Sequence, residues 1–229
     1  MHILINLAEH NHLGCSMKCP FCAWYQQDYG KYWFPSDDEL DKALEKSPNF
    51  LVLSGGGDPL YHFEKNKDLI KHFVDYVTEH GAVAGIYSHD LATLWSYRKL
   101  FSTWPVKFII SVRRHYSVLE EKIVEYFAAN HQLHIISTVF NDSLDAPNWQ
   151  EIQSFINTFR KYAPIIFREH WVYSYEDREQ VKEWRKQLRE LRCCFAASDH
   201  YRRTQVMFEG KFTTCGEIDK TVLGIEKNR

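Results

Sequence analysis

The sequence lacks several features that would assign a protein to a broad class at once. Its 229 residues carry 28 basic and 30 acidic side chains, so there is no basic excess of the kind that drives nucleic-acid binding through counterion release. No apolar run approaches the roughly 18 residues needed to span a membrane, and the first residues do not have the pattern of a secretory signal. We therefore expect a cytoplasmic globular protein that binds neither membranes nor nucleic acid.

Cysteine and glycine are scarce and unevenly distributed. Three of the six cysteines lie between positions 15 and 22, three lie between positions 193 and 215, and none lies in the 170 residues that separate these groups. Of only ten glycines, three are consecutive at positions 55–57. In an intracellular protein, clustered cysteines indicate metal ligands or catalytic thiols rather than disulfides.

The apolar pattern alternates between short β-rich runs and helical stripes. Two capping boxes, Ser36 with Glu39 and Ser117 with Glu120, predict helix starts. Six short, mostly apolar runs are typical of strands buried on both faces; they are Ile3–Leu7, Phe50–Leu53, Val83–Tyr87, Lys107–Val112, Leu133–Val139 and Ile165–Phe167. Strands joined by crossover helices predict a parallel sheet with right-handed connections.

Six β/α units are too few for a closed eight-stranded barrel. The residues alone predict an α/β fold over residues 1–175, either an open six-stranded parallel β/α partial barrel or a flat doubly wound sheet. Both folds bind ligands beyond the carboxyl ends of the strands. From residue 176 the pattern changes to a helix followed by a hairpin (204–208 and 211–214), so we expect a small C-terminal helix-hairpin appendage over 176–229.

The first cysteine group follows the first predicted strand. Cys15, Cys19 and Cys22 place three thiolates within eight residues, which is enough to wrap one metal centre but leaves one ligand position open. A zinc loop completed by His10 or His12, or three buried thiols, is the alternative interpretation.

This CxxxCxxC pattern, with Phe21 before the last cysteine, resembles the radical S-adenosylmethionine (radical SAM) superfamily. A second motif of that family, Gly-Gly-Glu-Pro at the end of the second strand, is similar to Gly55-Gly56-Gly57-Asp58-Pro59 here, with aspartate where glutamate is usual. From the residues alone, this segment could also be a tight strand-to-helix turn. The resemblance spans roughly residues 1–175 and implies the partial-barrel fold.

The resemblance implies a specific chemistry. Cys15, Cys19 and Cys22 would hold a [4Fe-4S] cluster, the amino and carboxylate groups of S-adenosylmethionine would chelate the open iron, and reductive cleavage would give a 5'-deoxyadenosyl radical that abstracts hydrogen from a substrate. An electron donor such as a flavodoxin or ferredoxin, and a peptide or small-molecule substrate, are the partners expected.

Further cofactor-binding residues are predicted at other strand ends. A cationic amino group needs carbonyl or carboxylate oxygens nearby, and Gly55, Gly56 and Gly57 let the main chain approach it, with Asp58 beside them. Ser111 and Arg113 end the fourth strand, where the family often places a polar side chain; Arg113 could pair with the ligand's carboxylate or belong to a solvated basic pair. Strand-end position alone suggests six further residues: Ser88, His89, Thr138, Asn141, Arg168 and His170.

The second cysteine group resembles the first half of the SPASM or Twitch auxiliary-cluster domains. Cys193, Cys194 and Cys215 would form a tentative second metal site, with Cys215 directly after the predicted hairpin. A second iron–sulfur cluster, a zinc site completed by His200, and a metal-free hairpin are the three alternatives.

Rival functions remain within and outside the enzyme class. A glycyl-radical-activating enzyme or a 7-carboxy-7-deazaguanine synthase would use the same cluster chemistry, although Ala23-Trp24 stand where the latter family usually has Ser or Thr. A non-catalytic iron–sulfur or zinc module for redox sensing is the alternative from another class. The glycine-aspartate segment argues against that module, because a structural metal site does not need a ligand cradle.

Overall fold

The computed structural model describes residues 2–9, 31–32, 34–54, 57–113, 115–139 and 149–168, together with the short segments 186–187, 190, 194–196, 205–208 and 211–214. Cys15, Cys19, Cys22, Gly55, Gly56, Cys193 and Cys215 lie outside these residues. Among the described helices, none combines the length and the apolar character needed to cross a bilayer.

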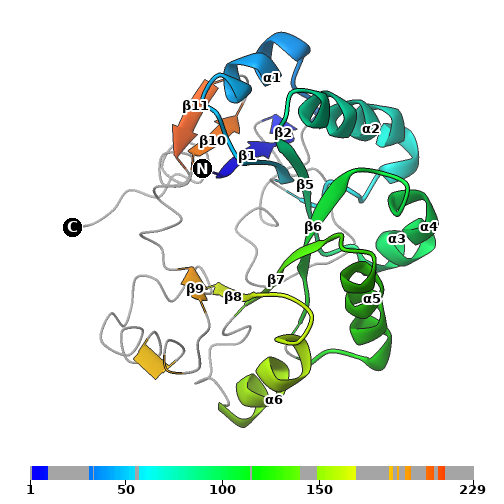
Figure 1. Cartoon of the computed structure of the whole chain (residues 1–229), viewed down its shortest axis with the longest axis vertical. Helices are drawn as coiled ribbons and strands as arrows, with labels where there is room; N and C mark the ends of the chain where they lie inside the picture. Colours follow the sequence, from blue (N-terminus) through cyan, green and yellow to red (C-terminus); the bar gives the residue numbers. More distant parts are fainter. Residues whose placement is uncertain are drawn as a thin grey trace.

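A parallel sheet forms the centre of the molecule and confirms the six predicted strands. Its six central strands all run in the same direction, in the order in which they occur along the chain. They are β1 (His2–Asn6), β4 (Phe50–Ser54), β5 (Val83–Ser88), β6 (Val106–Ser111), β7 (Leu133–Val139) and β8 (Ile165–Arg168). The sheet curves into an open arc, so the α/β partial barrel is confirmed (Figure 1).

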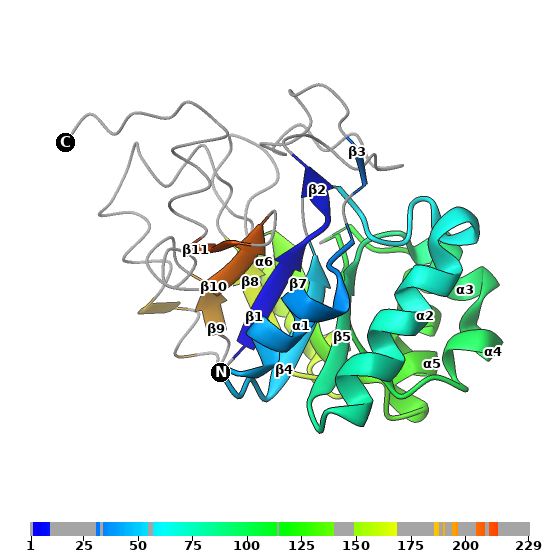
Figure 2. The same cartoon turned by 90° about the horizontal axis from the view of Figure 1, so that it is seen from above.

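The helices connect successive strands and cover the outer, convex face of the arc (Figures 1 and 2). Both predicted capping boxes are present, at the starts of α1 and α5. The helices are α1 (Asp37–Leu44), α2 (Phe63–Glu79), α3 (Leu91–Ser96), α4 (Arg98–Phe101), α5 (Val118–Ala129) and α6 (Trp149–Phe159).

Three further strands extend the sheet beyond the predicted six. β9 (Cys194–Ala196) pairs parallel with β8 at one edge, and β10 (Gln205–Phe208) pairs parallel with β1 at the other. β11 (Lys211–Thr214) pairs antiparallel with β10, which confirms the predicted hairpin. The hairpin thus continues the sheet of the barrel, and the division at residue 176 remains a prediction.

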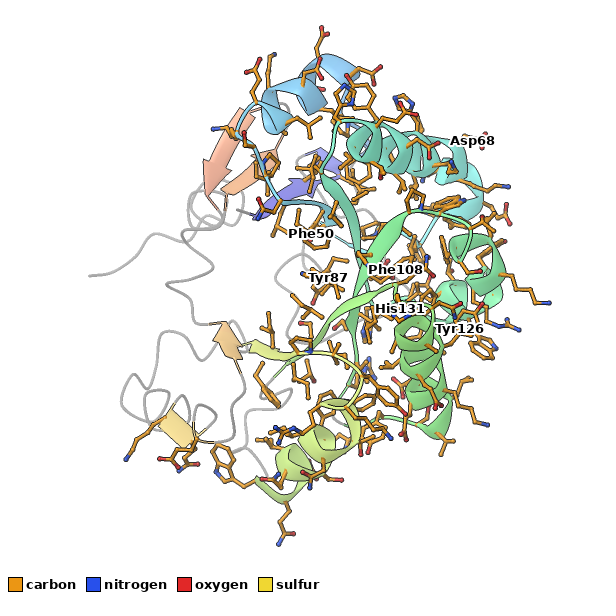
Figure 3. The ribbon with its side chains drawn as sticks, in the orientation of Figure 1. Phe50, Asp68, Tyr87, Phe108, Tyr126 and His131 are labelled. Carbon is orange, nitrogen blue, oxygen red and sulfur yellow. The ribbon has the colours of Figure 1, made fainter. Side chains whose placement is uncertain are left out.

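The two faces of the sheet bury different side chains. Ile5, Leu53 and Phe108 are fully buried on the convex side, in one core cluster with apolar residues of the helices. On the helix-free, concave side, Phe50 and Val52 of β4 pack with Ile109 of β6 in a smaller cluster. Figure 3 shows this division, with Phe50 and Tyr87 on the concave side and Phe108 facing the helices. Alternation along each strand therefore separates a large helix-covered core from a second surface inside the arc.

Gly85 allows the Phe50 ring to lie across the concave face. A Cβ atom at position 85 would stand 2.5 Å from Cζ and 2.8 Å from Cε2 of Phe50, well inside van der Waals contact. Position 85 of β5 must therefore lack a side chain, because the Phe50 ring of β4 occupies that space.

We predict that Gly85→Ala destabilises the fold by about 1–3 kcal/mol, because the added methyl forces the Phe50 ring from its place. Chemical denaturation measures the free energy of unfolding. The matched test is the same substitution in a Phe50→Leu background, where the clashing ring atoms are absent and the cost of Gly85→Ala should fall. An equal cost in both backgrounds would contradict the assignment.

Candidate functional site

The carboxyl ends of β1 and β4 lie next to each other, so the segments that carry the two sequence motifs start from adjacent points. Asn6 is the register partner of Ser54, and the Leu7 amide donates a hydrogen bond of 3.1 Å to the Ser54 carbonyl. The segment with the first cysteines follows β1, and the glycine segment follows β4. Parallel pairing of adjacent strands thus places the starts of both loops at the same edge of the sheet.

The cysteine segment, residues 10–30, is flanked by two short strands that pair with each other near that edge. β2 (Ala8–Glu9) pairs antiparallel with β3 (Lys31–Tyr32), with Ala8 opposite Tyr32. Figure 2 shows this two-stranded ribbon beyond the carboxyl end of β1. Residues 10–30, which include Cys15, Cys19 and Cys22, therefore connect two points that lie together beside the strand end. The three thiolates of this segment can supply three of the four ligands of a [4Fe-4S] cluster, so the chemistry of the residues fits that group with one iron left open.

The glycine segment needs glycine for its backbone conformation. Gly57 has φ +140°, which side-chain-bearing residues rarely adopt, and it directly precedes Asp58. Gly55 and Gly56 lie between it and the end of β4, outside the described residues. The main chain here turns where a Cβ atom would be strained, as the sequence predicted.

The Asp58 side chain points into the protein. It is only 3% exposed, and its Oδ1 accepts from the Leu60 amide at 2.9 Å and from Ser88 Oγ at 2.8 Å. Its Oδ2 accepts from the His89 amide at 2.5 Å, the Asp90 amide at 2.8 Å and Ser88 Oγ at 3.1 Å. The carboxylate thereby joins the loop after β4 to the residues that end β5 and begin α3.

Burial raises the pKa of Asp58 to about 6, against the hydrogen bonds from Leu60, His89 and Ser88, which act in the opposite direction. The nearby Asp90 carboxylate adds to the rise. Removal of the carboxylate from water has the largest effect on this pKa, because little solvent reaches Asp58.

Two more contacts continue the series of strand-end hydrogen bonds. His89 Nδ1 lies 2.8 Å from the Ser111 carbonyl oxygen at the end of β6. The Val112 amide then donates to the Ser137 carbonyl of β7 at 2.9 Å. Since a carbonyl only accepts, His89 Nδ1 carries the hydrogen. We name the contacts from Leu7–Ser54 through Asp58 and His89 to Val112–Ser137 the strand-end rim.

The remaining predicted residues differ in how far the structure describes them. Ser111 is buried on β6 and Arg113 is exposed two residues later, on the same edge as the glycine segment. Thr138 is buried on β7, and its hydroxyl has no hydrogen-bond partner among the described residues. Asn141, His170 and the Arg168 side chain fall outside the described part of the chain.

Asp90 was missed from the sequence although it carries a local signal. Its carboxylate accepts from the Thr93 amide at 3.0 Å and from Thr93 Oγ1 at 2.8 Å, as the N-cap of α3. Aspartate followed three residues later by threonine, directly after a strand, is a helix-start pattern. Because Asp90 caps α3, it fixes the main chain of His89 and Asp90, whose amides donate to the Asp58 carboxylate.

The described strands next to the second cysteine group lie at opposite edges of the sheet. Cys194 begins β9, whereas Thr214, which precedes Cys215, ends β11. These strands occupy opposite ends of the sheet order and of the arc in Figure 1. Cys193 and Cys215 are not described, and among the described residues no three His, Cys, Asp or Glu side chains group as a metal site. The second metal site remains a prediction.

The raised pKa of Asp58 predicts how stability depends on pH. The folded chain binds this proton more tightly than the unfolded chain, whose aspartates titrate near 3.8, so raising the pH from about 4 to about 6 removes stability. The stability of the unaltered chain minus that of Asp58→Asn should fall by about 2 kcal/mol over this window. Denaturation at several pH values checks this; a difference that grows with pH would contradict it.

No protein-family model and no curated protein matches this chain. Solved structures do match its fold. SuiB from Streptococcus suis bound to S-adenosylmethionine superimposes with a TM-score of 0.60 at 15% identity, covering 86% of this chain and 50% of SuiB. SuiB bound to precursor peptide SuiA gives 0.58 at 13% identity, covering 85% and 48%.

A radical SAM methyltransferase from Sphaerobacter thermophilus gives a TM-score of 0.55 at 13% identity, covering 82% of this chain and 64% of the methyltransferase. The chain thus spans about half the length of SuiB. At these identities the comparisons establish the fold, and they confirm the α/β partial barrel that the two motifs predicted for a radical SAM protein.

Proposed function

We propose that this chain is a radical SAM enzyme that cleaves S-adenosylmethionine reductively at a [4Fe-4S] cluster and uses the resulting 5'-deoxyadenosyl radical to abstract hydrogen from a substrate. The observation that carries the proposal is the meeting of the two motifs. The cysteine segment and the glycine segment start from adjacent strand ends, joined by the hydrogen bond from Leu7 to Ser54. A cluster and the molecule that binds it must lie together, and two segments that start from adjacent strand ends support this arrangement.

The cysteines and the glycine main chain have separate tasks in this proposal. Cys15, Cys19 and Cys22 hold three irons and leave the fourth open to the amino and carboxylate groups of S-adenosylmethionine. The bound cluster supplies one electron to the sulfonium, while the protein positions the ligand and excludes water. In this proposal, main-chain oxygens of the glycine segment, residues 55–57, accept hydrogen bonds from the ligand's ammonium group.

Arg113 and Ser111 are the proposed contacts at the other side of the ligand. Arg113 is exposed at the carboxyl end of β6, where its guanidinium can form a charge-assisted pair with the ligand's carboxylate. Ser111, which is buried at the same strand end, is the proposed contact for a ribose hydroxyl. Only one strand, β5, lies between β4, which precedes the proposed cation site, and β6, which precedes the proposed anion site.

A peptide is the substrate class that we favour. SuiB, whose fold this chain shares, has been solved with a precursor peptide bound. A ferredoxin or flavodoxin type of donor would supply the electron. The chain covers only part of the SuiB chain, and a small metabolite is the second substrate class that the same site can serve.

The experiment is anaerobic reconstitution with iron and sulfide, followed by reduction with S-adenosylmethionine present. We expect about four irons per chain at the first site and release of 5'-deoxyadenosine. Cys19→Ala should lose that iron and the product together, whereas Ser16→Ala, in the same segment, should keep both. Unchanged iron in Cys19→Ala would contradict the ligand assignment, and intact S-adenosylmethionine beside a reducible cluster would favour a redox-sensing module.

A further inference from the structure

The apolar cluster on the concave face is packed and almost closed to ligands. Phe50, Val52 and Ile109 form it, and they are only 3%, 1% and 8% exposed. The Phe50 ring also contacts the ring of His134 on β7 at a centroid distance of 4.5 Å, although β5 and β6 lie between their strands. The cluster therefore offers very little surface to a molecule inside the arc.

Tyr87 of β5 covers this cluster and carries a polar group across it. Its side chain is half-buried and packs against the cluster, and its register partner on β6 is Ile109. The Tyr87 hydroxyl donates to Ser137 Oγ on β7 at 3.0 Å, so the side chain spans β6 on the concave face (Figure 3). Tyr87 thus presents both a ring and a hydroxyl group inside the arc.

The hydroxyl of Tyr87 lies close to the proposed ribose contact. Ser137, which accepts its hydrogen bond, is the register partner of Ser111 on β6. Register partners on neighbouring strands share a face of the sheet, and the strands are about 4.8 Å apart. The 5' carbon that takes hydrogen from the substrate is attached to the ribose for which Ser111 is proposed. The proposed function therefore requires the reacting carbon of the substrate to lie near the Tyr87–Ser137 pair.

The hydrogen bond to Ser137 limits what Tyr87 can bind. A phenol has one hydroxyl hydrogen, and Tyr87 donates it to Ser137, so its oxygen acts toward any other partner as an acceptor. The neighbouring side chains of Ile109, Ile135 and Ser137 are uncharged, which disfavours an ionised group at this place. A neutral N–H donor satisfies both conditions, and a peptide main chain supplies one at every residue except proline.

We propose that Tyr87 is a specificity-determining residue for a peptide substrate, and that its hydroxyl accepts a hydrogen bond from the peptide N–H next to the carbon that loses hydrogen. Ser137 is a positioning residue, because it orients that hydroxyl. This inference rests on the function proposed above and deepens it, since it assigns the substrate class to a described contact. The sequence did not reveal the pair, because its two members are fifty residues apart.

The experiment uses molecules of the organism that encodes this chain. Cells are grown in heavy water, and their extract is divided into a peptide fraction and a small-metabolite fraction. Each fraction is added with S-adenosylmethionine to the reconstituted, reduced chain. Abstraction moves one deuterium from a substrate C–D bond to the 5' carbon, so mass spectrometry measures the proportion of 5'-deoxyadenosine that carries a single deuterium.

The variants are Tyr87→Phe, Ser137→Ala and, as the matched control, Tyr126→Phe on α5 at the convex side (Figure 3). Tyr87→Phe removes only the hydroxyl oxygen and keeps the ring. The deuterated proportion is a ratio within one sample, so a lower yield of folded protein does not change it. A second measurement needs no turnover: ultrafiltration without reductant gives the amount of deuterated peptide that each chain retains when S-adenosylmethionine is present.

We expect the peptide fraction to supply the deuterium in the unaltered chain. Tyr87→Phe should lower the deuterated proportion and the retained peptide by about threefold to tenfold, the usual effect of one lost hydrogen bond. Ser137→Ala should lower both by a smaller factor, and Tyr126→Phe should change neither.

Equal values for Tyr87→Phe and the unaltered chain would overturn the proposal, and so would deuterium that comes from the metabolite fraction alone or from neither fraction. These outcomes leave the proposed function intact, because 5'-deoxyadenosine is still released. If the unaltered chain releases no 5'-deoxyadenosine, the proposed function fails and this inference fails with it.

Discussion

Hydrogen bonds at the carboxyl ends of neighbouring strands are the constraint on which the rest of the site depends. Parallel pairing aligns the strands, but a ligand site needs the loops that follow them to be fixed as well. The strand-end rim does this from β1 to β7, with main-chain bonds at its two ends and the side chains of Asp58 and His89 between them. Among these residues, Asp58 makes the most of these contacts, because its carboxylate accepts from four donor groups.

The concave face changes in character along the strands. From the amino end of β4 to the middle of β6 it is apolar, with Phe50, Val52 and Ile109 packed together. Nearer the carboxyl ends it carries hydroxyl groups: the Tyr87 hydroxyl donates to Ser137 Oγ at 3.0 Å across β6. The polar part of the concave face therefore lies toward the carboxyl ends of the strands, which is where β/α barrels bind their ligands.

Local signals predicted most of the fold. The six central strands were placed to within one residue at nearly every end, because continuous apolar runs mark strands buried on both faces. The capping boxes at Ser36 and Ser117 marked helix starts through contacts only three residues apart. The hairpin was also predicted, but its parallel pairing with β1 was not, since a short strand's partner is decided by contacts two hundred residues away.

Sequence-based prediction of the site has the same limit, because contacts between distant residues leave no local pattern. Composition and spacing located the cysteine and glycine segments, and Gly57 has the backbone conformation that the segment predicted. The direction of the Asp58 side chain depends on Ser88, His89 and Asp90, which no local pattern connects with it. The sequence therefore located both motifs, whereas the contacts of the Asp58 carboxylate required the three-dimensional arrangement.

Magnetic resonance tests the central claim, that one strand edge assembles both the cluster and its ligand, most directly. S-adenosylmethionine carrying magnetic isotopes at its amino nitrogen and carboxylate oxygen would be added to the reduced, reconstituted chain, and electron–nuclear double resonance recorded. Resolved hyperfine coupling of both nuclei to the cluster is the result that we predict. Absence of coupling, with the cluster intact and the ligand bound, would show that the two motifs do not form a single site.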